Sequence, residues 1–203
     1  MYTGMEYPVY RKIASYTPKA ATPITYATGN GAFLDEAVSA TVSETIADIM
    51  VRTDNRTRIW DNGLTDYTMD LEVGDIPPEA YADMLGYVKN TGTGSTVTHY
   101  TRTSADSQEV SFGWIRNVQN SATEKYWEAF WFLRTKWNQN SNAFRTQDRQ
   151  KEYAMATING HGMEVEKEDG TVEFFEYMRF DTEAAAKTWL FGSTRANIGT
   201  TTT

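Results

Sequence analysis

The side chains of this sequence that could do chemistry are carboxylates, histidines and aromatic rings. Two carboxylates that flank a sugar bond can hydrolyse it, and four glutamates gather around one predicted hairpin turn: Glu164, Glu166, Glu173 and Glu176. Acidic side chains that alternate along a strand more often form its solvated side. We therefore interpret these four as a solvent-facing row and predict that the protein is not an enzyme.

The two histidines do not form a recognisable metal site. His99 lies in a predicted strand and His161 in a glycine-flanked turn, without the close spacing of helical metal motifs. The chain has no cysteine, which removes disulfides, thiolate nucleophiles and zinc–sulfur sites. It also lacks the nucleophile-elbow, Walker and dinucleotide-binding patterns. These observations predict no metal, no cofactor and no catalytic residue.

Three tryptophans, Trp127, Trp131 and Trp137, recur at even offsets along one predicted strand. Exposed, they would form a platform on which sugar rings stack. A chain with six Trp, twelve Tyr and nine Phe more often places such rings in its core, which is the interpretation we favour. A β-sandwich carbohydrate-binding module that uses Trp127 and Trp131 stays open as the alternative.

Length and charge bound the remaining possibilities. At 203 residues the chain is long enough for one domain with a sizeable core. Its net charge of -8 argues against a surface that binds nucleic acid, because binding phosphates requires a positive electrostatic potential. No apolar run reaches the length of a membrane span, so we expect no membrane contact and synthesis in a reducing cytoplasm.

The stretch Leu64–Gly86 is the most informative part of the chain. Its first ten residues alternate, so apolar side chains face one way while Asp66, Asp70 and Glu72 face the other. This predicts a strand with one buried face and one acidic face. Prolines are tolerated only at a helix start, so Pro77-Pro78 and the apolar spacing that follows predict a helix over 77–85.

Similar alternation predicts most of a mainly β fold. The other predicted strands are Pro8–Tyr16, Glu36–Glu44, Thr96–Thr103, Glu109–Val118, Lys125–Trp137, Tyr153–Asn159, Met163–Glu168 and Thr171–Arg179. Threonine as a cap predicts a second helix over 182–191. We expect one domain over 1–191 with two packed antiparallel sheets and flanking helices, a loose N-terminal segment to Pro8, and a flexible Thr-rich tail over 192–203.

One long connection, residues 45–62, has no clean period and is predicted to be a loop. Its length suggests a function of its own. It carries Arg52, Asp54, Arg56 and Arg58, a small basic island in an acidic protein. Arginine is well suited to pair with the carboxylates of a neighbouring molecule, although a solvated loop is the simpler interpretation.

Taken in order, these features resemble the major tail proteins that build the tail tube of long non-contractile bacteriophage tails. The resemblance covers about Glu6–Phe191. The segments that carry it are VYRKI at Val9–Ile13, EAVSATVS at Glu36–Ser43, WDNG at Trp60–Gly63, YTMDLEVGDIPPEAYADMLGY at Tyr67–Tyr87, VSFGWIRN at Val110–Asn117, KYWEAFWFLRTKW at Lys125–Trp137 and FDTEAAAKTWLF at Phe180–Phe191. The TRIW stretch Thr57–Trp60 and the Thr-rich end are not characteristic of that family.

The resemblance implies two packed β-sheets with a flanking helix, and six copies that close into a ring. Rings would stack into a tube through which DNA passes without specific binding. Partners implied are further copies of the chain and the tail terminator, tape measure and distal tail proteins of the virion. On this basis we hypothesise that Asp66, Asp70 and Glu72 line the channel, and that the 45–62 loop contacts an adjacent ring or subunit.

Overall fold

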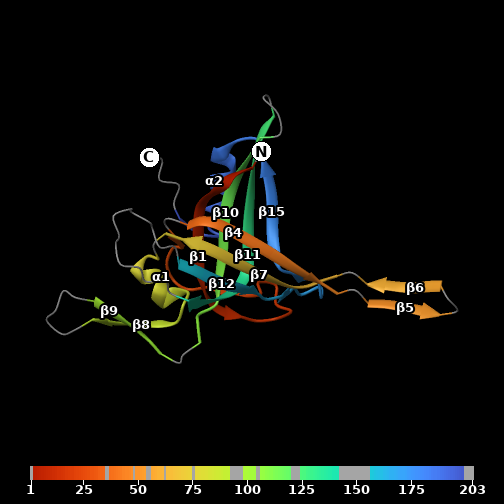
Figure 1. Ribbon diagram of the computed structural model, residues 1–203, viewed down its shortest axis with the longest axis horizontal. Coiled ribbons are helices and arrows are strands. Elements are labelled where there is room, and N and C mark those ends of the chain that lie inside the picture. The colour runs from red at the N-terminus through yellow and green to blue at the C-terminus, as the bar shows by residue number, and fades with distance from the viewer. Residues whose placement is uncertain are drawn as a thin grey trace, which may run out of the picture.

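The chain folds into a mainly β structure with two short helices, as its sequence patterns predict (Figure 1). The computed structural model describes residues 2–34, 37–47, 49–53, 56–61, 63–74, 76–91, 98–103, 106–119, 124–141 and 156–198. Neither helix within these ranges is long and apolar enough to cross a membrane.

The observed elements extend the predicted ones. The strands are β1 (Tyr2–Tyr16), β2 (Ile24–Tyr26), β3 (Ala32–Phe33), β4 (Ala37–Ile46), β5 (Ile49–Thr53), β6 (Arg56–Asp61), β7 (Leu64–Val73), β8 (Tyr87–Thr91), β9 (Thr98–Arg102), β10 (Val110–Gln119), β11 (Lys125–Ser141), β12 (Ala156–Gly162), β13 (Val165–Glu166), β14 (Val172–Glu173) and β15 (Phe175–Phe180). The helices are α1 (Pro78–Asp83) and α2 (Glu183–Leu190). Strands β2, β3, β5, β6 and β8 lie in segments where the sequence predicted none.

Nine strands form one antiparallel sheet that folds into two packed layers. Their hydrogen-bonded order is β2-β1-β10-β11-β12-β7-β4, with β15 added to β11 and β3 added to β1. Strands β1, β10, β11 and β15 form the first layer. Strands β4, β7 and β12 form the second, which crosses the first in Figure 1. The predicted class, mainly β with antiparallel sheets and flanking helices, is confirmed.

Strand β11 belongs to both layers because its partners change along its length. Its first half pairs with β15 and its second half with β12, while β10 lies along its other edge. Phe112 is opposite Phe132, but Val110 is opposite Thr135, so β11 holds one extra residue between these pairs. Such a bulge reverses which alternate side chains face the core.

This bulge corrects one expectation about the tryptophans. Trp127 and Trp131 precede the bulge and pack in the cluster beneath α2, whereas Trp137 follows it and packs between the layers. The three rings therefore do not share one face of the strand. The even offsets in the sequence predicted a common face because a bulge leaves no recognisable mark in a run that is apolar on both sides.

Two apolar clusters cover the two faces of the first layer. The cluster between the layers contains Tyr10, Leu34, Tyr67, Met69, Leu71, Val73, Ile76, Ala80, Met84, Leu85, Val110, Phe112, Trp114, Phe132, Trp137, Ile158 and Phe174. The cluster on the outer face contains Val9, Ile115, Trp127, Ala129, Trp131, Leu133, Val165, Ala186, Leu190, Phe191 and Ala196. Among the described residues, neither cluster covers the outer face of the second layer.

Helix α1 closes one end of the space between the layers. Pro77 is its N-cap and Pro78 lies in its first turn, where a missing amide hydrogen costs no helical bond. Ala80, Met84 and Leu85 enter the core between the layers. The chain leaves through Gly86 at φ 71°, a left-handed conformation that glycine adopts without a steric penalty.

Helix α2 covers the outer face of the first layer. The Thr182 hydroxyl caps it by accepting a hydrogen bond from the Ala185 amide at 3.3 Å. Glu183 and Lys187 form an i,i+4 ion pair at 2.7 Å on the exposed side. Ala186 and Leu190 are fully buried against the sheet.

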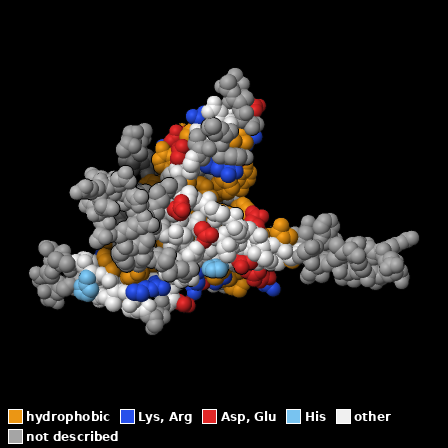
Figure 2. Space-filling view, in the orientation of Figure 1, with side chains coloured by type: hydrophobic (Ala, Val, Ile, Leu, Met, Phe, Trp, Pro, Cys, Tyr) orange, Lys and Arg blue, Asp and Glu red, His pale blue; other side chains and the backbone are white. Residues whose placement is uncertain are grey.

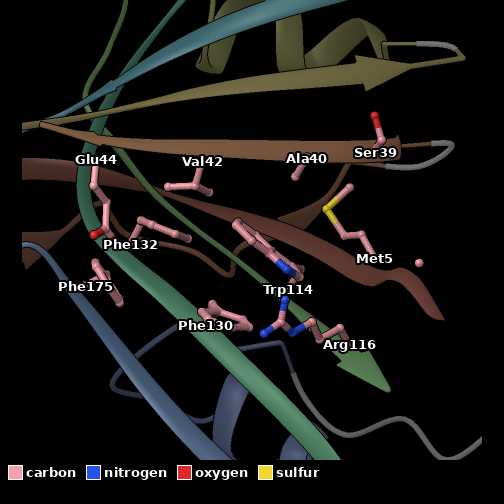
Figure 3. A pocket seen from close by; sticks show the side chains of 11 residues that line it. Met5, Ser39, Ala40, Val42, Glu44, Trp114, Arg116, Phe130, Phe132 and Phe175 are labelled. Carbon is pink, nitrogen blue, oxygen red and sulfur yellow. The ribbon is translucent and has the colours of Figure 1, made fainter. Parts of the chain in front are cut away.

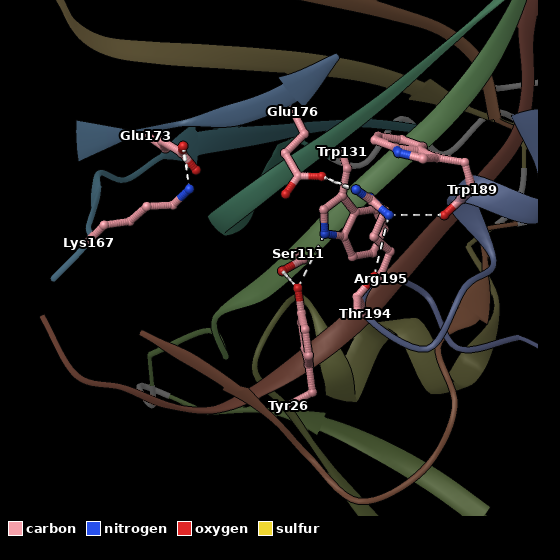
Figure 4. A network of polar contacts seen from close by, with 9 residues as sticks. All are labelled: Tyr26, Ser111, Trp131, Lys167, Glu173, Glu176, Trp189, Thr194 and Arg195. Atoms are coloured by element: carbon pink, nitrogen blue, oxygen red, sulfur yellow. Dashed lines mark hydrogen bonds and ion pairs between the residues drawn. The ribbon is translucent and has the colours of Figure 1, made fainter. Parts of the chain in front are cut away.

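Both ends of the chain are more ordered than predicted. Tyr2–Glu6, expected to be loose, extends β1 and pairs with β10. Of the tail expected to be flexible, Gly192–Ile198 packs against α2, and residues 199–203 lie outside the described part. Arg195 anchors this segment through Glu176 at 2.5 Å and the Trp189 carbonyl at 3.4 Å (Figure 4). The anchor uses a charge pair distant in sequence, which periodicity does not reveal.

Two hairpins stand apart from the layers. The segment predicted as a long loop contains β5 and β6, which pair only with each other among the described strands and project from the body in Figure 1. The Ala47 amide donates to the Gly63 carbonyl at 2.9 Å and closes the base of this hairpin. Strands β8 and β9 form the second hairpin, beyond α1.

Tyr67 on β7 carries a buried hydroxyl that has no hydrogen-bond partner among the described residues. The side chain is fully buried between Phe132 and Phe174, and its ring lies against Gly162, where a β-carbon would come within 1.9 Å. Burial raises the pKa of this hydroxyl, with the charge of Asp66 as a smaller cause. A polar atom that gives up water without a new partner costs free energy.

Tyr67→Phe should therefore raise the free energy of unfolding by about 1 kcal/mol, since it removes the unsatisfied hydroxyl and keeps the ring. Urea denaturation followed by circular dichroism measures the change. Tyr10→Phe is the matched control, because the Tyr10 hydroxyl donates to Asp83 at 3.3 Å and its loss should not stabilise. A lower midpoint for Tyr67→Phe would show that the hydroxyl has a partner.

Candidate functional site

The outer face of β4, β7 and β12 forms a continuous polar surface. Strand alternation turns Met69 and Leu71 inward and leaves Asp66, Asp70 and Glu72 outward, as predicted. Neighbouring strands extend this face with polar side chains, which are Ser39, Thr41, Ser43 and Thr45 on β4 and Thr157, Asn159 and His161 on β12. We call this surface the acidic face.

Neutral groups hold the carboxylates of the acidic face. The Asn159 amide donates to Asp70, the Ser39 hydroxyl donates to Glu72 at 2.9 Å, and the Tyr67 backbone amide donates to Asp66 at 2.7 Å. Among the described residues, no Lys or Arg forms an ion pair with any of the three. Their negative charge therefore acts on whatever lies in front of the face.

Charge is segregated between the two layers. Strands β4, β7 and β12 hold four acidic residues and no Lys or Arg. Strands β1, β10, β11 and β15 hold seven basic residues against three acidic ones. In Figure 2 the middle of the view, over β4, β7 and β12, is mostly white with red carboxylates and without blue. The outer face of the second layer therefore carries three carboxylates on β7 among neutral polar side chains, while Glu44 of β4 lines the cavity on the other side.

The predicted basic island lies on the β5–β6 hairpin. Arg52 belongs to β5, while Arg56 and Arg58 belong to β6; Asp54 lies outside the described residues. Register places the hairpin at the end of the sheet where β4 finishes and β7 begins. The structure therefore keeps this group apart from Asp70 and Glu72, which lie farther along β7.

The aromatic platform proposed for sugar binding is covered. Trp127 is 8% exposed and Trp131 is 1% exposed, and both pack beneath α2. The Trp131 indole also donates to the Tyr26 hydroxyl at 3.2 Å (Figure 4). These rings belong to the core, which removes the surface on which the carbohydrate-binding alternative depended.

The other candidate residues are separated or ion-paired. His99 lies on β9 and His161 on β12, and the described residues contain no group of three potential metal ligands. Three of the four glutamates near the Asp-Gly turn pair with cations, namely Glu166 with Lys19, Glu173 with Lys167 and Glu176 with Arg195. Only Glu164 is exposed, and the other three are half-buried in ion pairs, so the four do not form the single solvent-facing row predicted from the sequence.

The sequence patterns did not identify a second site, an aromatic and arginine surface on the inner face of the first layer. Cross-strand register aligns Trp114, Phe130 and Tyr177 in one row, and Arg116, Glu128 and Arg179 in the next. Trp114 stacks between Phe130, at 5.5 Å, and Phe132, at 5.0 Å. We call the two rows the aromatic–arginine face.

This face borders a cavity of about 420 Å³ that opens beside β4 (Figure 3). Ala40 and Val42 of β4 line one wall, and Trp114 and Phe130 line the other. Met5 of β1 also lines the cavity. The sandwich core therefore continues past the edge of the second layer and reaches solvent.

A buried carboxylate ties the two rows together. Glu128 is 6% exposed and accepts hydrogen bonds from Arg116 Nε at 2.6 Å and from the Tyr177 hydroxyl at 2.6 Å. Arg116 also lies over the Phe130 ring at 5.0 Å. The hydrogen bond to Glu128, followed by burial, raises the pKa of Tyr177 to about 12. The sequence contains the charged residues Arg116, Glu128 and Arg179 on three separate strands. Only the register of these strands shows that they are neighbours.

Comparison with known proteins assigns no family to the chain: no family model matches it, and no curated protein shows significant similarity to it. The function is therefore argued from the two faces and the hairpins.

Tyr177→Phe should change how stability depends on pH. With its pKa raised from 10.0 to about 12, Tyr177 holds its proton in the folded state at a pH where the unfolded chain has lost it. The wild type should therefore lose stability as pH rises from 10 to about 12, and the variant should lose less. Urea unfolding across this range measures the difference. Parallel curves above pH 10 would show that the Tyr177–Glu128 contact is absent.

Proposed function

We propose that this chain is the tail-tube protein of a long non-contractile bacteriophage tail. Six copies close into a ring, rings stack into a tube, and the acidic face lines the channel through which DNA enters the host. The proposal is supported by the order of sequence features that resembles the major tail proteins and by a mainly β fold with two flanking helices. The single observation that carries it is the acidic face, continuous over three strands and free of Lys and Arg.

An acidic channel wall suits the passage of DNA. Phosphates are repelled over about 8 Å at physiological ionic strength, so the duplex can move without sites at which it is held. Ser, Thr and Asn side chains, together with His161, fill the rest of the face, and no Lys or Arg lies on its strands. A wall carrying arginine or lysine would instead bind the backbone and slow the transfer.

Free strand edges provide joints for assembly. Among the described strands, β4 pairs only with β7, and β15 pairs only with β11. An open edge exposes unpaired amides and carbonyls, which drive association between chains. A contact between different surfaces of successive copies is heterologous, and it makes a ring where the rotation closes and a filament where it does not.

The β5–β6 hairpin is proposed as a contact to an adjacent ring or subunit. A two-stranded hairpin alone in water is only marginally stable, so a partner surface would stabilise it. Arg52, Arg56 and Arg58 give it a charge opposite to that of the chain as a whole. In the tail, the tail terminator, tape measure and distal tail proteins would be its further partners.

Negative-stain electron microscopy of the concentrated protein, with its solution mass, should show hollow rings or tubes with six-fold end views.

Deleting residues 48–62 and joining Ala47 to Gly63 through Asn-Gly should leave the fold intact, because the hairpin base is already closed by the hydrogen bond between Ala47 and Gly63. This variant should form shorter or fewer tubes. A protein that stays monomeric at high concentration would contradict the tube function, whereas normal tubes from the deletion would contradict only the role of the hairpin.

Charge reversal on the acidic face should separate assembly from DNA passage. Asp70→Lys with Glu72→Lys should leave tubes intact, because both side chains are exposed, and should slow genome ejection from particles roughly several-fold. The matched control is Asp106→Lys with Asp181→Lys, which changes the net charge equally at exposed positions outside the acidic face and outside the β13–β14 hairpin. Equal ejection rates for the two doubly substituted particles would show that the acidic face does not line the channel.

A further inference from the structure

The aromatic–arginine face has the composition of a protein-binding surface. It combines Trp114, Phe130 and Tyr177 with two arginines, and Tyr177 is 48% exposed. Aromatic residues and arginine are enriched in the centres of protein interfaces, where they contribute most of the binding energy. In Figure 2 orange and blue side chains gather over the upper parts of β10, β11 and β15, above the acidic face.

One cation of this face, Arg179, has no anionic partner within the described ranges of the chain. Glu128 is held by Arg116 and Tyr177, each at 2.6 Å. Arg179, opposite Glu128 in register, instead lies over the Tyr126 ring at 3.5 Å and forms no ion pair with any described residue. A guanidinium stacked on a ring keeps its outward donors in a fixed orientation, which favours a carboxylate supplied by another molecule.

The β13–β14 hairpin carries carboxylates of the kind that Arg179 lacks. Glu164, Glu168 and Asp169 are exposed and form no ion pair within the described part of the chain. Val172 beside them is 44% exposed. The hairpin is held firmly, because Val165 is buried and the Glu166 amide donates to the Tyr16 hydroxyl at 3.0 Å.

The hairpin and the arginine lie at opposite ends of β15. Strand β14 ends at Glu173, immediately before β15 begins, and Arg179 is near the end of β15. Six residues of extended chain span about 20 Å, so one copy cannot bring the two groups together. Two copies aligned head to tail can bring the hairpin of one chain against Arg179 of the other.

The geometry points to a contact between copies in which the β13–β14 hairpin of one chain docks on the aromatic–arginine face of the next. Glu168 of the first chain pairs with Arg179 of the second, while Val172 packs against the exposed ring of Tyr177. The contact joins different surfaces, so it repeats in one direction as a ring or tube requires. This inference rests on the tube function proposed above and names one of its joints.

Charge exchange tests the contact. Arg179→Glu should lower the assembled fraction about tenfold, because like charges then meet Glu168, while Arg179→Lys keeps the charge and should assemble. Combining Arg179→Glu with Glu168→Arg restores an opposite pair and should recover most of the assembly. Circular dichroism and thermal unfolding check that each variant is folded.

The absence of native cysteine allows a direct test by crosslinking. A chain carrying both Arg179→Cys and Glu168→Cys should give a ladder of disulfide-linked oligomers under oxidising conditions, whereas either substitution alone should give dimers at most. Thr188→Cys with Glu168→Cys is the control, since Thr188 is exposed on α2 away from this face, and it should give no ladder.

Each outcome bears on one proposal. Tubes that form without a ladder and that tolerate Arg179→Glu would overturn this contact and leave the tube function standing. A wild type without any assembly would contradict the tube function and, with it, the contact. A polysaccharide gel shift that is lost in Arg179→Glu would overturn the contact by showing that the face binds sugar instead.

Discussion

The structure depends on one strand, β11, being shared by two layers. Its first half completes the layer that α2 covers, and its second half begins the layer that carries the acidic face. The bulge between Phe132 and Thr135 makes this possible, because it turns the strand's core-facing residues over as the sheet changes direction. Without the extra residue, the Trp137 side chain would point out of the core. Strand β12 could then not pair with β11 while the two strands turned their apolar side chains toward the same core.

Sequence reasoning succeeded where a strand has one buried and one solvated face. In β7 every second residue is apolar, so the pattern predicted both the strand and the outward carboxylates Asp66, Asp70 and Glu72. It failed in the β5–β6 hairpin, where the sequence has no clean alternation of apolar and polar residues. In β11, with both faces buried, it predicted the strand but not the change of face at the bulge. The aromatic–arginine face could not be predicted, because its rows exist only after three strands have taken their register.

The segregation of acidic and basic residues between the two layers is the feature that most narrows the functions the protein could have. Strands that share an outer face carry one sign of charge, and the basic residues gather on the layer behind, where most meet a carboxylate or an aromatic ring. Such separation brings no stability to a single chain, since exposed like charges repel one another. It becomes useful when a surface faces a polyanion, or when one end of a molecule must recognise the other end of its copy.

The projecting hairpin has a consequence for how the chain folds. Strands β4 and β7 pair across a long connection, from Ile46 opposite Leu64 outward to Ala37 opposite Val73. Closing such a loop costs chain entropy before any contact forms. Because β5 and β6 continue the same antiparallel ribbon, pairing can start at the short turn at their tip and proceed residue by residue into the body. The hairpin can then act as a nucleus from which the strands of the acidic layer pair in sequence. A long-range strand pairing is thereby replaced by a series of local pairings.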